Sequence, residues 1–345
     1  MTQEPEVTAA ATFCATLVDE WARAGVRHAI VCPGSRSTPM ALALAADDCL
    51  AVQVVHDERS AAFLALGVGL ATGIPAVVLT TSGTAAAELH PAVVEADLSS
   101  VPMIVCTADR PPELQDVGAP QTIDQVHLYG RSVRWFAAPE VPDDARAATW
   151  RPLAARAVAE ALGPRPGPVH LNLAFRDPLV GTPATLPAGR GGDAPWVAVR
   201  SGRPEEIDDL ADVAARLDVR RGVVLAGGGS SADPTAVLAL ADFLGWPVLA
   251  DPRAAGVWTP SASVVAHADE LLRVPAFAAE RPDVVLRFGE PPASKVLNQW
   301  LADVPMIAAV SHGRWIDPAA QVVATLAEDA LDALLGHIGT GARCV

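Results

Sequence analysis

An acidic residue at the start of a predicted helix is the first candidate for chemistry. Glu58 follows a β-branched run that is typical of a strand, and Asp57 is suited to cap the helix, because its side-chain oxygen can accept from a first-turn amide. In open α/β folds, ligands bind at the edge where strands lead into helices. A carboxyl group there would face a bound ligand. A second interpretation stays open, since acids in first turns also complement the helix dipole.

Small and charged residues follow several other predicted strands, so all of them are expected at one edge of a sheet. Two of these clusters carry an arginine, Arg36 and Arg110, and a few local guanidinium groups suit anionic small molecules with carboxylates. The clusters are residues 32–39 (CPGSRSTP), 81–85 (TSGTA), 107–114 (TADRPPEL) and 118–125 (GAPQTIDQ).

Composition limits the classes of partner. The chain has 345 residues, of which 51% are hydrophobic and 19% charged, and its net charge is −15. Such a composition folds into globular domains, and a strong negative charge disfavours binding to nucleic acid or to an anionic membrane. The five cysteines are scattered without metal-ligand spacing, so we expect no metal site in this chain and a reducing cytoplasm.

Other patterns exclude further functions. The N-terminus lacks the basic segment of a signal peptide, and the uncharged run at 60–87 is interrupted by Pro75, so neither half spans a bilayer. The glycines at 227–229 do not complete a dinucleotide-binding fingerprint and favour a simple strand–helix turn. Ser82 does not fit a nucleophile elbow.

The order of the predicted elements indicates an α/β fold with two doubly wound parallel-sheet domains. Apolar strands without polar alternation are typical of a parallel sheet that is covered on both faces. We expect the first domain at 1–178, a linker rich in Pro, Gly and Ala at 179–203, and a second domain at 204–345. Among the helices, we predict 84–97 and 144–162 in the first domain, and 204–217 and 319–335 in the second.

Lys295 is the only lysine beside 24 arginines. A compact ammonium differs from a planar guanidinium, and its position at a predicted helix start opposes the dipole, so local stability does not explain it. The alternative is that the position of this single lysine has no functional meaning.

The motifs quoted above, together with HDERSAAF at 56–63 and PAVVEA at 91–96, resemble the N-terminal part of the 2-succinyl-5-enolpyruvyl-6-hydroxy-3-cyclohexene-1-carboxylate synthase family. These are thiamine-diphosphate enzymes of menaquinone biosynthesis. GPVHLNLAFRDPL at 167–179 is similar to the end of the pyrimidine-binding domain in the wider thiamine-diphosphate family, and FGEPPASKVLNQWL at 288–301 matches the middle domain less closely.

The resemblance implies a role for each candidate residue. Glu58 would be the catalytic acid that hydrogen-bonds the aminopyrimidine ring of thiamine diphosphate, with Asp57, Arg59 and Asp109 supporting the site. The remaining implied contacts are Thr81, Ser82 and Gly83 to the cofactor and Ser35, Arg36, Arg110, Gln121 and Lys295 to substrate carboxylates. A Lys-Arg pair of the family is Lys295-Val296 here, so one substrate contact would be lost.

The implied reaction is decarboxylation of 2-oxoglutarate, followed by addition of the succinyl carbanion equivalent to isochorismate; the carbanion chemistry belongs to the cofactor. The family's diphosphate-binding domain, which carries the Mg²⁺ ligands, is not found in this sequence. We therefore expect the chain to be inactive alone. Its partners would be copies of itself, in a homodimer or homotetramer, or a separate diphosphate-domain subunit.

Two other functions stay open from the sequence. One is an acetolactate-synthase-like or decarboxylase-like thiamine-diphosphate enzyme, which the motifs around Arg36 and Arg110 disfavour. The other is a non-catalytic binding module derived from the synthase, which the missing diphosphate-binding domain favours.

Overall fold

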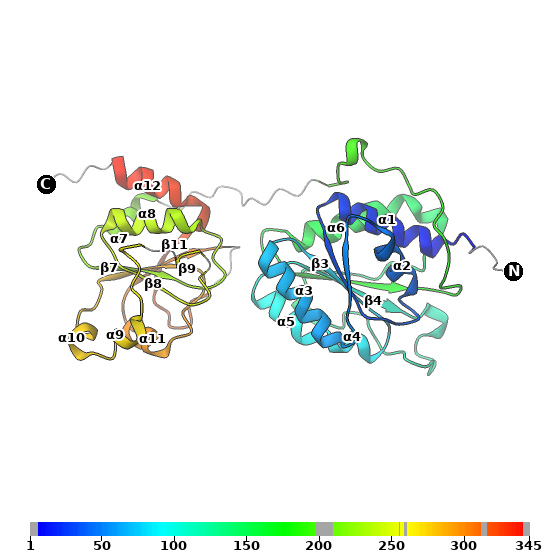
Figure 1. The fold of residues 1–345 in the computed structure, drawn as a ribbon, viewed down its shortest axis with the longest axis horizontal. Coiled ribbons are helices and arrows are strands. Elements are labelled where there is room, and N and C mark those ends of the chain that lie inside the picture. The colour runs from blue at the N-terminus through cyan, green and yellow to red at the C-terminus, as the bar shows by residue number, and fades with distance from the viewer. Residues whose placement is uncertain (1–5, 198–209, 255, 259–260, 312–315, 341–345) are drawn as a thin grey trace. The chain divides into compact units, whose positions relative to one another are not determined.

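The structure is a computed structural model that describes residues 6–197, 210–254, 256–258, 261–311 and 316–340. Two compact units divide the chain, Met1–Gly202 and Arg203–Val345. Each contains a parallel β-sheet between two layers of helices (Figure 1), so the chain is an α/β protein with two parallel-sheet domains.

In unit 1 the strand order is β2-β1-β3-β4-β6-β5, and every pairing is parallel. The strands are β1 (His28–Val31), β2 (Ala51–Val54), β3 (Ala76–Thr80), β4 (Met103–Asp109), β5 (Trp135–Ala137) and β6 (Pro168–Ala174). The helices are α1 (Ala9–Arg23), α2 (Thr38–Ala46), α3 (Glu58–Thr72), α4 (Thr84–Glu88), α5 (His90–Leu98) and α6 (Trp150–Ala161).

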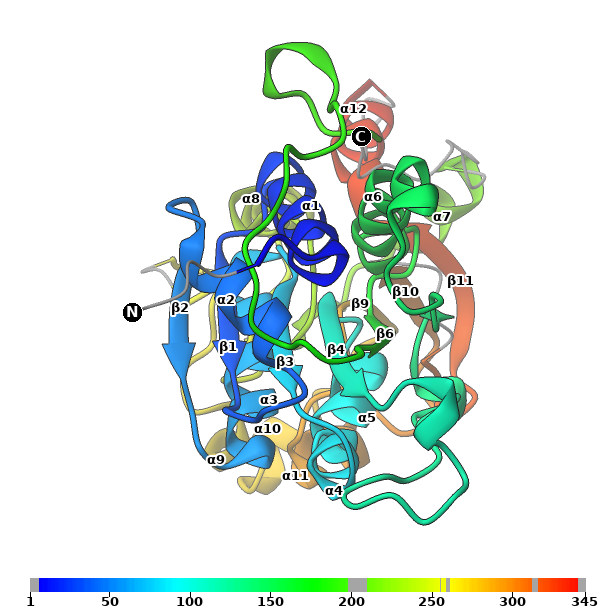
Figure 2. The same cartoon turned by 90° about the vertical axis from the view of Figure 1, so that its right-hand side faces the viewer.

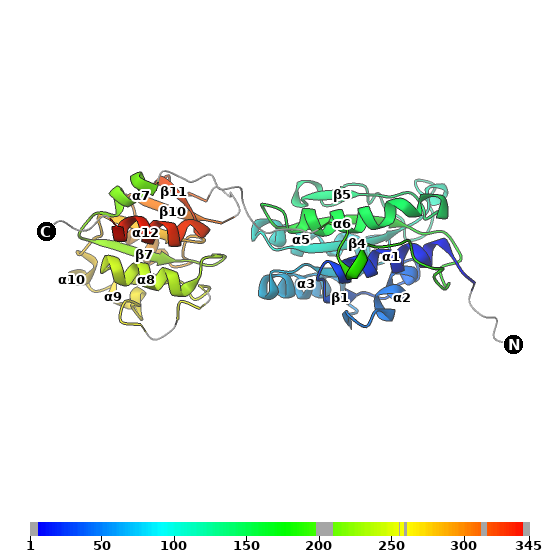
Figure 3. The same cartoon turned by 90° about the horizontal axis from the view of Figure 1, so that it is seen from above.

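Both faces of the central strands β1, β3, β4 and β6 are buried, because their consecutive residues, which point to opposite sides of the sheet, are nearly all apolar. In β4, Ile104 and Cys106 pack in the core below α1, α2 and α6, while Met103 and Val105 pack against α3 and α5. Figure 2 shows these two helix layers on opposite sides of the sheet, and Figure 3 shows α1 and α6 running side by side over one face.

Unit 2 has the strand order β11-β10-β9-β7-β8, again with parallel pairings. Its strands are β7 (Gly222–Ala226), β8 (Val248–Ala250), β9 (Val284–Phe288), β10 (Met306–Val310) and β11 (Val322–Ala327). Its helices are α7 (Leu210–Leu217), α8 (Pro234–Leu244), α9 (Ala268–Leu271), α10 (Pro275–Ala278), α11 (Lys295–Trp300) and α12 (Leu331–Thr340). Helices α7, α8 and α12 cover one face, and α9 and α11 pack on the other.

The predicted helix at 319–335 is wrong. Residues Val322–Ala327 form β11, which pairs in parallel with β10, and α12 follows and continues through Gly336. The β-branched pair Val322 and Val323 suits a strand. The segment becomes a strand because it pairs with β10, and this pairing cannot be read from the local sequence.

Two further helices are shorter than predicted, and prolines explain both. The helix expected at 84–97 is two helices that meet at Leu89, because Pro91 has no amide hydrogen for an α-helical bond. The helix expected at 144–162 begins as a 3₁₀ turn at Asp144–Thr149, and the α-helix starts only two residues before Pro152. The first part of the helix expected at 204–217 lies outside the described residues.

Candidate active site

The strand order of unit 1 places a topological switch point between β1 and β3. The chain goes from β1 outward to β2 and then returns to β3 on the other side, so the loops that follow β1 and β3 diverge at the carboxyl edge. Ligands of open parallel sheets bind at such a point. The loop after β1 carries Arg36 and the loop after β3 carries Ser82. These loops touch, since a Cβ atom on Gly34 would lie 2.3 Å from the Cβ of Thr81.

Glu58 is the first residue of α3, and Asp57 caps that helix as predicted, accepting from the Ser60 amide at 2.7 Å. The Glu58 side chain is half-buried, and no hydrogen bond or ion pair of its carboxylate is found among the described residues. The Cys32 thiol at the end of β1 has a pKa that is raised to about 12, by burial first and then by the charges of Glu58 and Asp57. This effect indicates that Glu58 lies near the end of β1. Glu58 therefore presents an uncommitted carboxylate at the carboxyl edge.

Arg36 and Arg110 concentrate positive charge at the same edge. Arg36 is buried, and its Nη1 donates to the carbonyl oxygen of Phe175 at 2.8 Å, while its buried Nε has no partner among the described residues. Burial lowers the pKa of Arg36, and repulsion from the Arg110 guanidinium lowers it further. Asp177, 3.6 Å away and largely exposed, offsets this only in part. Two guanidinium groups so placed can hold an anion with carboxylates.

The turn after β3 is hydrogen-bonded to the loop at 118–125. The Ser82 hydroxyl donates to the carbonyl oxygen of Gln121 at 2.9 Å, and the Gln121 side-chain amide donates back to the Ser82 carbonyl at 3.0 Å. Gly83 has a φ of +88°, and a Cβ there would lie 2.9 Å from the Cγ of Gln121, so both conformation and space require glycine. Thr81, Ser82 and Gly83 are all buried.

Of the other predicted residues, Ser35 is exposed in the loop after β1. Lys295 belongs to unit 2, where it is exposed at the start of α11, directly after the capping residue Ser294. The structure thus brings the loops of Arg36, Ser82, Arg110 and Gln121 together in unit 1. The functions assigned to them stay predictions.

A buried polar network behind this edge was not predicted from the sequence. Gln125 is 1% exposed; its Oε1 accepts from the Gly83 amide at 2.9 Å, and its Nε2 donates to Ala108 O at 3.1 Å and to Asn172 Oδ1 at 2.8 Å. Asn172 also accepts from the Thr107 hydroxyl at 2.8 Å and donates to Asp109 at 2.8 Å. The only sequence signal is the pair of polar residues, His170 and Asn172, inside an apolar strand.

In unit 2 the loops at the corresponding switch point, after β7 and β9, are also in contact. A Cβ on Gly227 would lie 1.8 Å from the carbonyl oxygen of Glu290, and the Glu290 amide donates to Gly228 at 2.9 Å. At the start of α8, the Glu328 carboxylate accepts from the hydroxyls of Ser230 and Ser231, both at 2.7 Å, and from the Ser231 amide at 2.6 Å. The glycine turn after β7 is therefore packed against its own chain, as expected for a simple strand–helix turn.

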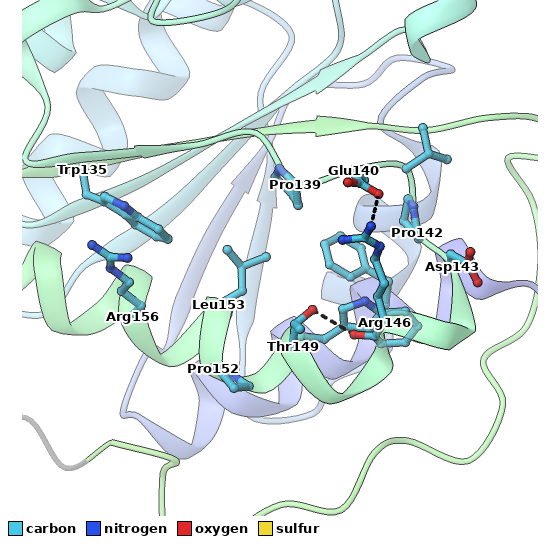
Figure 4. A pocket seen from close by; sticks show the side chains of 13 residues that line it. Trp135, Pro139, Glu140, Pro142, Asp143, Arg146, Thr149, Pro152, Leu153 and Arg156 are labelled. Atoms are coloured by element: carbon cyan, nitrogen blue, oxygen red, sulfur yellow. Dashed lines mark hydrogen bonds and ion pairs between the residues drawn. The ribbon is translucent and has the colours of Figure 1, made fainter.

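A pocket of about 380 Å³ lies elsewhere in unit 1, between α6 and the segment that follows β5 (Figure 4). Its walls are Trp135, Leu153 and several prolines, and Arg146 lies 2.8 Å from Glu140 at its rim. The Arg156 guanidinium lies 4.6 Å from the Trp135 ring centroid. None of the predicted site residues lines this pocket.

Metal and membrane features were also sought. Within the residues that the structure describes, no group of three or more His, Cys, Asp and Glu side chains is arranged to hold a metal ion. In the same part of the chain, no helix has both the length and the hydropathy that a membrane span requires. The uncharged run at 60–87 is divided among α3, β3 and α4.

Comparison with protein families defines the class of protein. Residues 11–128 match the thiamine pyrophosphate enzyme N-terminal TPP binding domain, and residues 188–330 match the middle domain of thiamine pyrophosphate enzymes. The chain belongs to the family of thiamine-pyrophosphate (thiamine-diphosphate) enzymes.

Within that family, the chain is similar to curated 2-succinyl-5-enolpyruvyl-6-hydroxy-3-cyclohexene-1-carboxylate synthases. The protein of Halobacterium salinarum is 46% identical over 324 residues, which are 87% of this chain and 55% of the relative. That of Thermobifida fusca is 45% identical over 307 residues (84% and 52%), and that of Geobacillus kaustophilus 44% over 333 residues (90% and 56%). The chain spans about half the length of the curated relatives it matches.

Proposed function

We propose that this chain supplies the pyrimidine-binding and middle domains of a 2-succinyl-5-enolpyruvyl-6-hydroxy-3-cyclohexene-1-carboxylate synthase. The complete enzyme decarboxylates 2-oxoglutarate and adds the succinyl unit to isochorismate. The observation that carries this proposal is the arginine pair at the switch point of unit 1. The Nε of buried Arg36 has no partner within the described part of the chain, and the repulsion from Arg110 exceeds the attraction of the exposed Asp177, so this edge favours a bound anion. Both substrates are dianions, and each offers two carboxylates to these guanidinium groups.

The residues present fit thiamine diphosphate at this edge. When bound, the cofactor would supply a nucleophilic thiazolium carbon and the capacity to stabilise negative charge. Glu58 has a half-buried carboxylate without a partner in the part of the chain that the structure describes, which suits a hydrogen bond to a ring nitrogen. The buried turn at Thr81, Ser82 and Gly83 would contact the cofactor. Mg²⁺ would accompany the diphosphate, on ligands of the diphosphate-binding domain.

Substrate contacts follow from the same arrangement. Arg36 and Arg110 bind carboxylates by paired hydrogen bonds, and Ser35 and the Gln121 loop complete the wall of the site. Lys295 is proposed as a further substrate-binding cation. Valine at 296 provides no charge, so this enzyme would rely on fewer cations than relatives with arginine there.

An apolar face supports a partner for unit 1. On the outer side of α3, Phe63 is 43% exposed and Leu70 is 67% exposed, one heptad apart, and Leu64 and Ile74 extend the same surface. This helix begins at Glu58, so a partner on this face also borders the site. We propose a second copy, in a homodimer or homotetramer, or a separate diphosphate-domain subunit. Four described cysteines are free thiols, which suits a cytoplasmic enzyme.

The direct test joins this chain to, or mixes it with, the diphosphate-binding part and supplies thiamine diphosphate and Mg²⁺. The expected result is release of CO₂ from 2-oxoglutarate that depends on isochorismate. Comparable turnover of pyruvate would favour an acetolactate-synthase-like enzyme. Isochorismate binding without any decarboxylation would favour a non-catalytic binding module.

A further inference from the structure

The hydrogen bonds in the buried network behind the site have fixed donors and acceptors. The Thr107 hydroxyl has one hydrogen, and it donates to Asn172 Oδ1 at 2.8 Å. The 2.7 Å contact between Thr107 Oγ1 and His170 Nε2 must therefore have the histidine as donor. This assigns the proton of His170 to Nε2. It also fixes the Asn172 amide, whose Oδ1 accepts twice and whose Nδ2 donates to Asp109.

Gln125 is the member of this network that joins three strand ends. Its oxygen faces the Gly83 amide after β3, and its nitrogen faces two acceptors, Ala108 O in β4 and Asn172 Oδ1 in β6. A flipped amide would set oxygen against both acceptors, so only one orientation is compatible with the neighbours. Both hydrogens of Nε2 are used, and the side chain is shielded from water.

These contacts reach both halves of the proposed site. Gly83 belongs to the turn proposed to meet the cofactor. Ala108 lies two residues before Arg110, whose own amide donates to Asp109 at 2.7 Å, and Asp109 in turn accepts from Asn172. One amide side chain thus links the position of the cofactor turn to that of a substrate-binding arginine.

We propose that Gln125 is a positioning residue, which holds the Gly83 turn and the Arg110 strand end in the relative geometry that the reaction requires. This inference rests on the proposed function. Gln125 does not touch the reacting atoms. Because small displacements of bound reactants strongly reduce turnover, its loss lowers kcat by a larger factor than it raises KM.

The test compares Gln125→Met with Gln125→Glu in the complete enzyme. Methionine has a similar shape and makes none of the three hydrogen bonds. Glutamate keeps the oxygen that accepts from Gly83 but sets its second oxygen against the two acceptors, Ala108 O and Asn172 Oδ1. We expect kcat to fall at least tenfold in Gln125→Met and by at least as large a factor in Gln125→Glu, with KM for both substrates within about threefold of wild type.

Thr16→Val is the matched control for the loss of a buried hydrogen bond, because Thr16 donates to Thr12 within α1 at 2.6 Å, outside the proposed site. It should lower the unfolding temperature while kcat stays unchanged. A folded Gln125→Met enzyme with wild-type kcat would overturn the proposal, and so would an equal loss of kcat in Thr16→Val.

A second measurement uses the 345-residue chain alone and does not require activity. Hydrogen exchange of the Gly83 amide should be at least tenfold faster in Gln125→Met than in wild type, and unchanged in Thr16→Val. Unchanged exchange in Gln125→Met would refute the anchoring of the turn. If exchange responds as expected while the complete wild-type enzyme fails to decarboxylate 2-oxoglutarate, the proposed function fails and the anchoring by Gln125 stands.

Discussion

Ser82 and Gln121 exchange hydrogen bonds in both directions, hydroxyl to carbonyl and side-chain amide to carbonyl, at 2.9 and 3.0 Å. The loop at 118–125 is therefore part of the wall of the switch point. Because the Gln121 amide already donates to Ser82, a substrate contact from Gln121 requires either its second amide hydrogen or a rotation of the side chain.

Glu58→Gln should abolish turnover in the complete enzyme while the fold is retained. Glutamine has nearly the same shape but cannot hold or release the proton at this edge. Steady-state kinetics should show kcat reduced by at least 10²-fold, and circular dichroism should match wild type. Near-normal turnover would remove Glu58 from the catalytic role. Asp57→Asn is a useful companion, because asparagine also caps helices and should leave most activity intact.

Arg36→Lys should raise KM for 2-oxoglutarate about tenfold or more, since a single ammonium cannot reproduce the paired hydrogen bonds of a guanidinium. The matched control is Arg27→Lys, at an exposed position of unit 1 outside the proposed site. Substrate saturation curves separate the two. An unchanged KM in Arg36→Lys would contradict the assignment of Arg36 to a substrate carboxylate.

Leu70→Glu should weaken the association of unit 1 with its partner, because it sets a charge in the middle of the exposed apolar face of α3. Sedimentation velocity of the chain should show a shift toward monomer. The control is Val180→Glu, which is also exposed and apolar but lies outside α3. Equal shifts in both variants would mean that general charge, and not this face, governs association.

His170 should make the protein less stable in acid. Burial, and secondarily the charge of His127, lowers its pKa to about 3, so the folded protein keeps it neutral while the unfolded chain binds a proton below pH 6.5 or so. Unfolding then takes up a proton, and the free energy of unfolding falls as the pH decreases from about 6.5 toward 3, with a limiting slope of roughly 1.4 kcal/mol per pH unit. Denaturant titrations should show this slope in wild type and a flatter dependence in His170→Gln. The exposed His56→Gln variant should retain the wild-type slope.

Glu328→Gln should destabilise unit 2 by about 1–3 kcal/mol, because an amide cannot accept all the donors of Ser230 and Ser231. Urea denaturation measures the loss. Ser311→Ala, which removes only an exposed hydroxyl at 3.4 Å from its acceptor, should change stability by less than about 0.5 kcal/mol. A Glu328→Gln protein as stable as wild type would show that the carboxylate is not required there.

Much of the fold was predictable because parallel strands buried on both faces leave continuous apolar runs. β3, β7 and β9 fall where such runs occur, and the Asp57 cap was evident from its residue type. β11 and the short edge strand β5 were not predictable, since a strand of few residues is defined by its neighbour in the sheet. The network around Gln125 was not predicted for a similar reason. The hydrogen-bond partners of Gln125 are 17, 42 and 47 residues away in the sequence, and a glutamine alone does not indicate them.

The contact between the loops after β7 and β9 has a consequence for the folding of unit 2. The Glu290 carbonyl leaves no room for a side chain at Gly227, and the Glu328 carboxylate binds both serines that follow the glycine turn. A partner on the same chain acts at a high effective concentration. We therefore expect the turn after β7 to keep its conformation without a bound nucleotide.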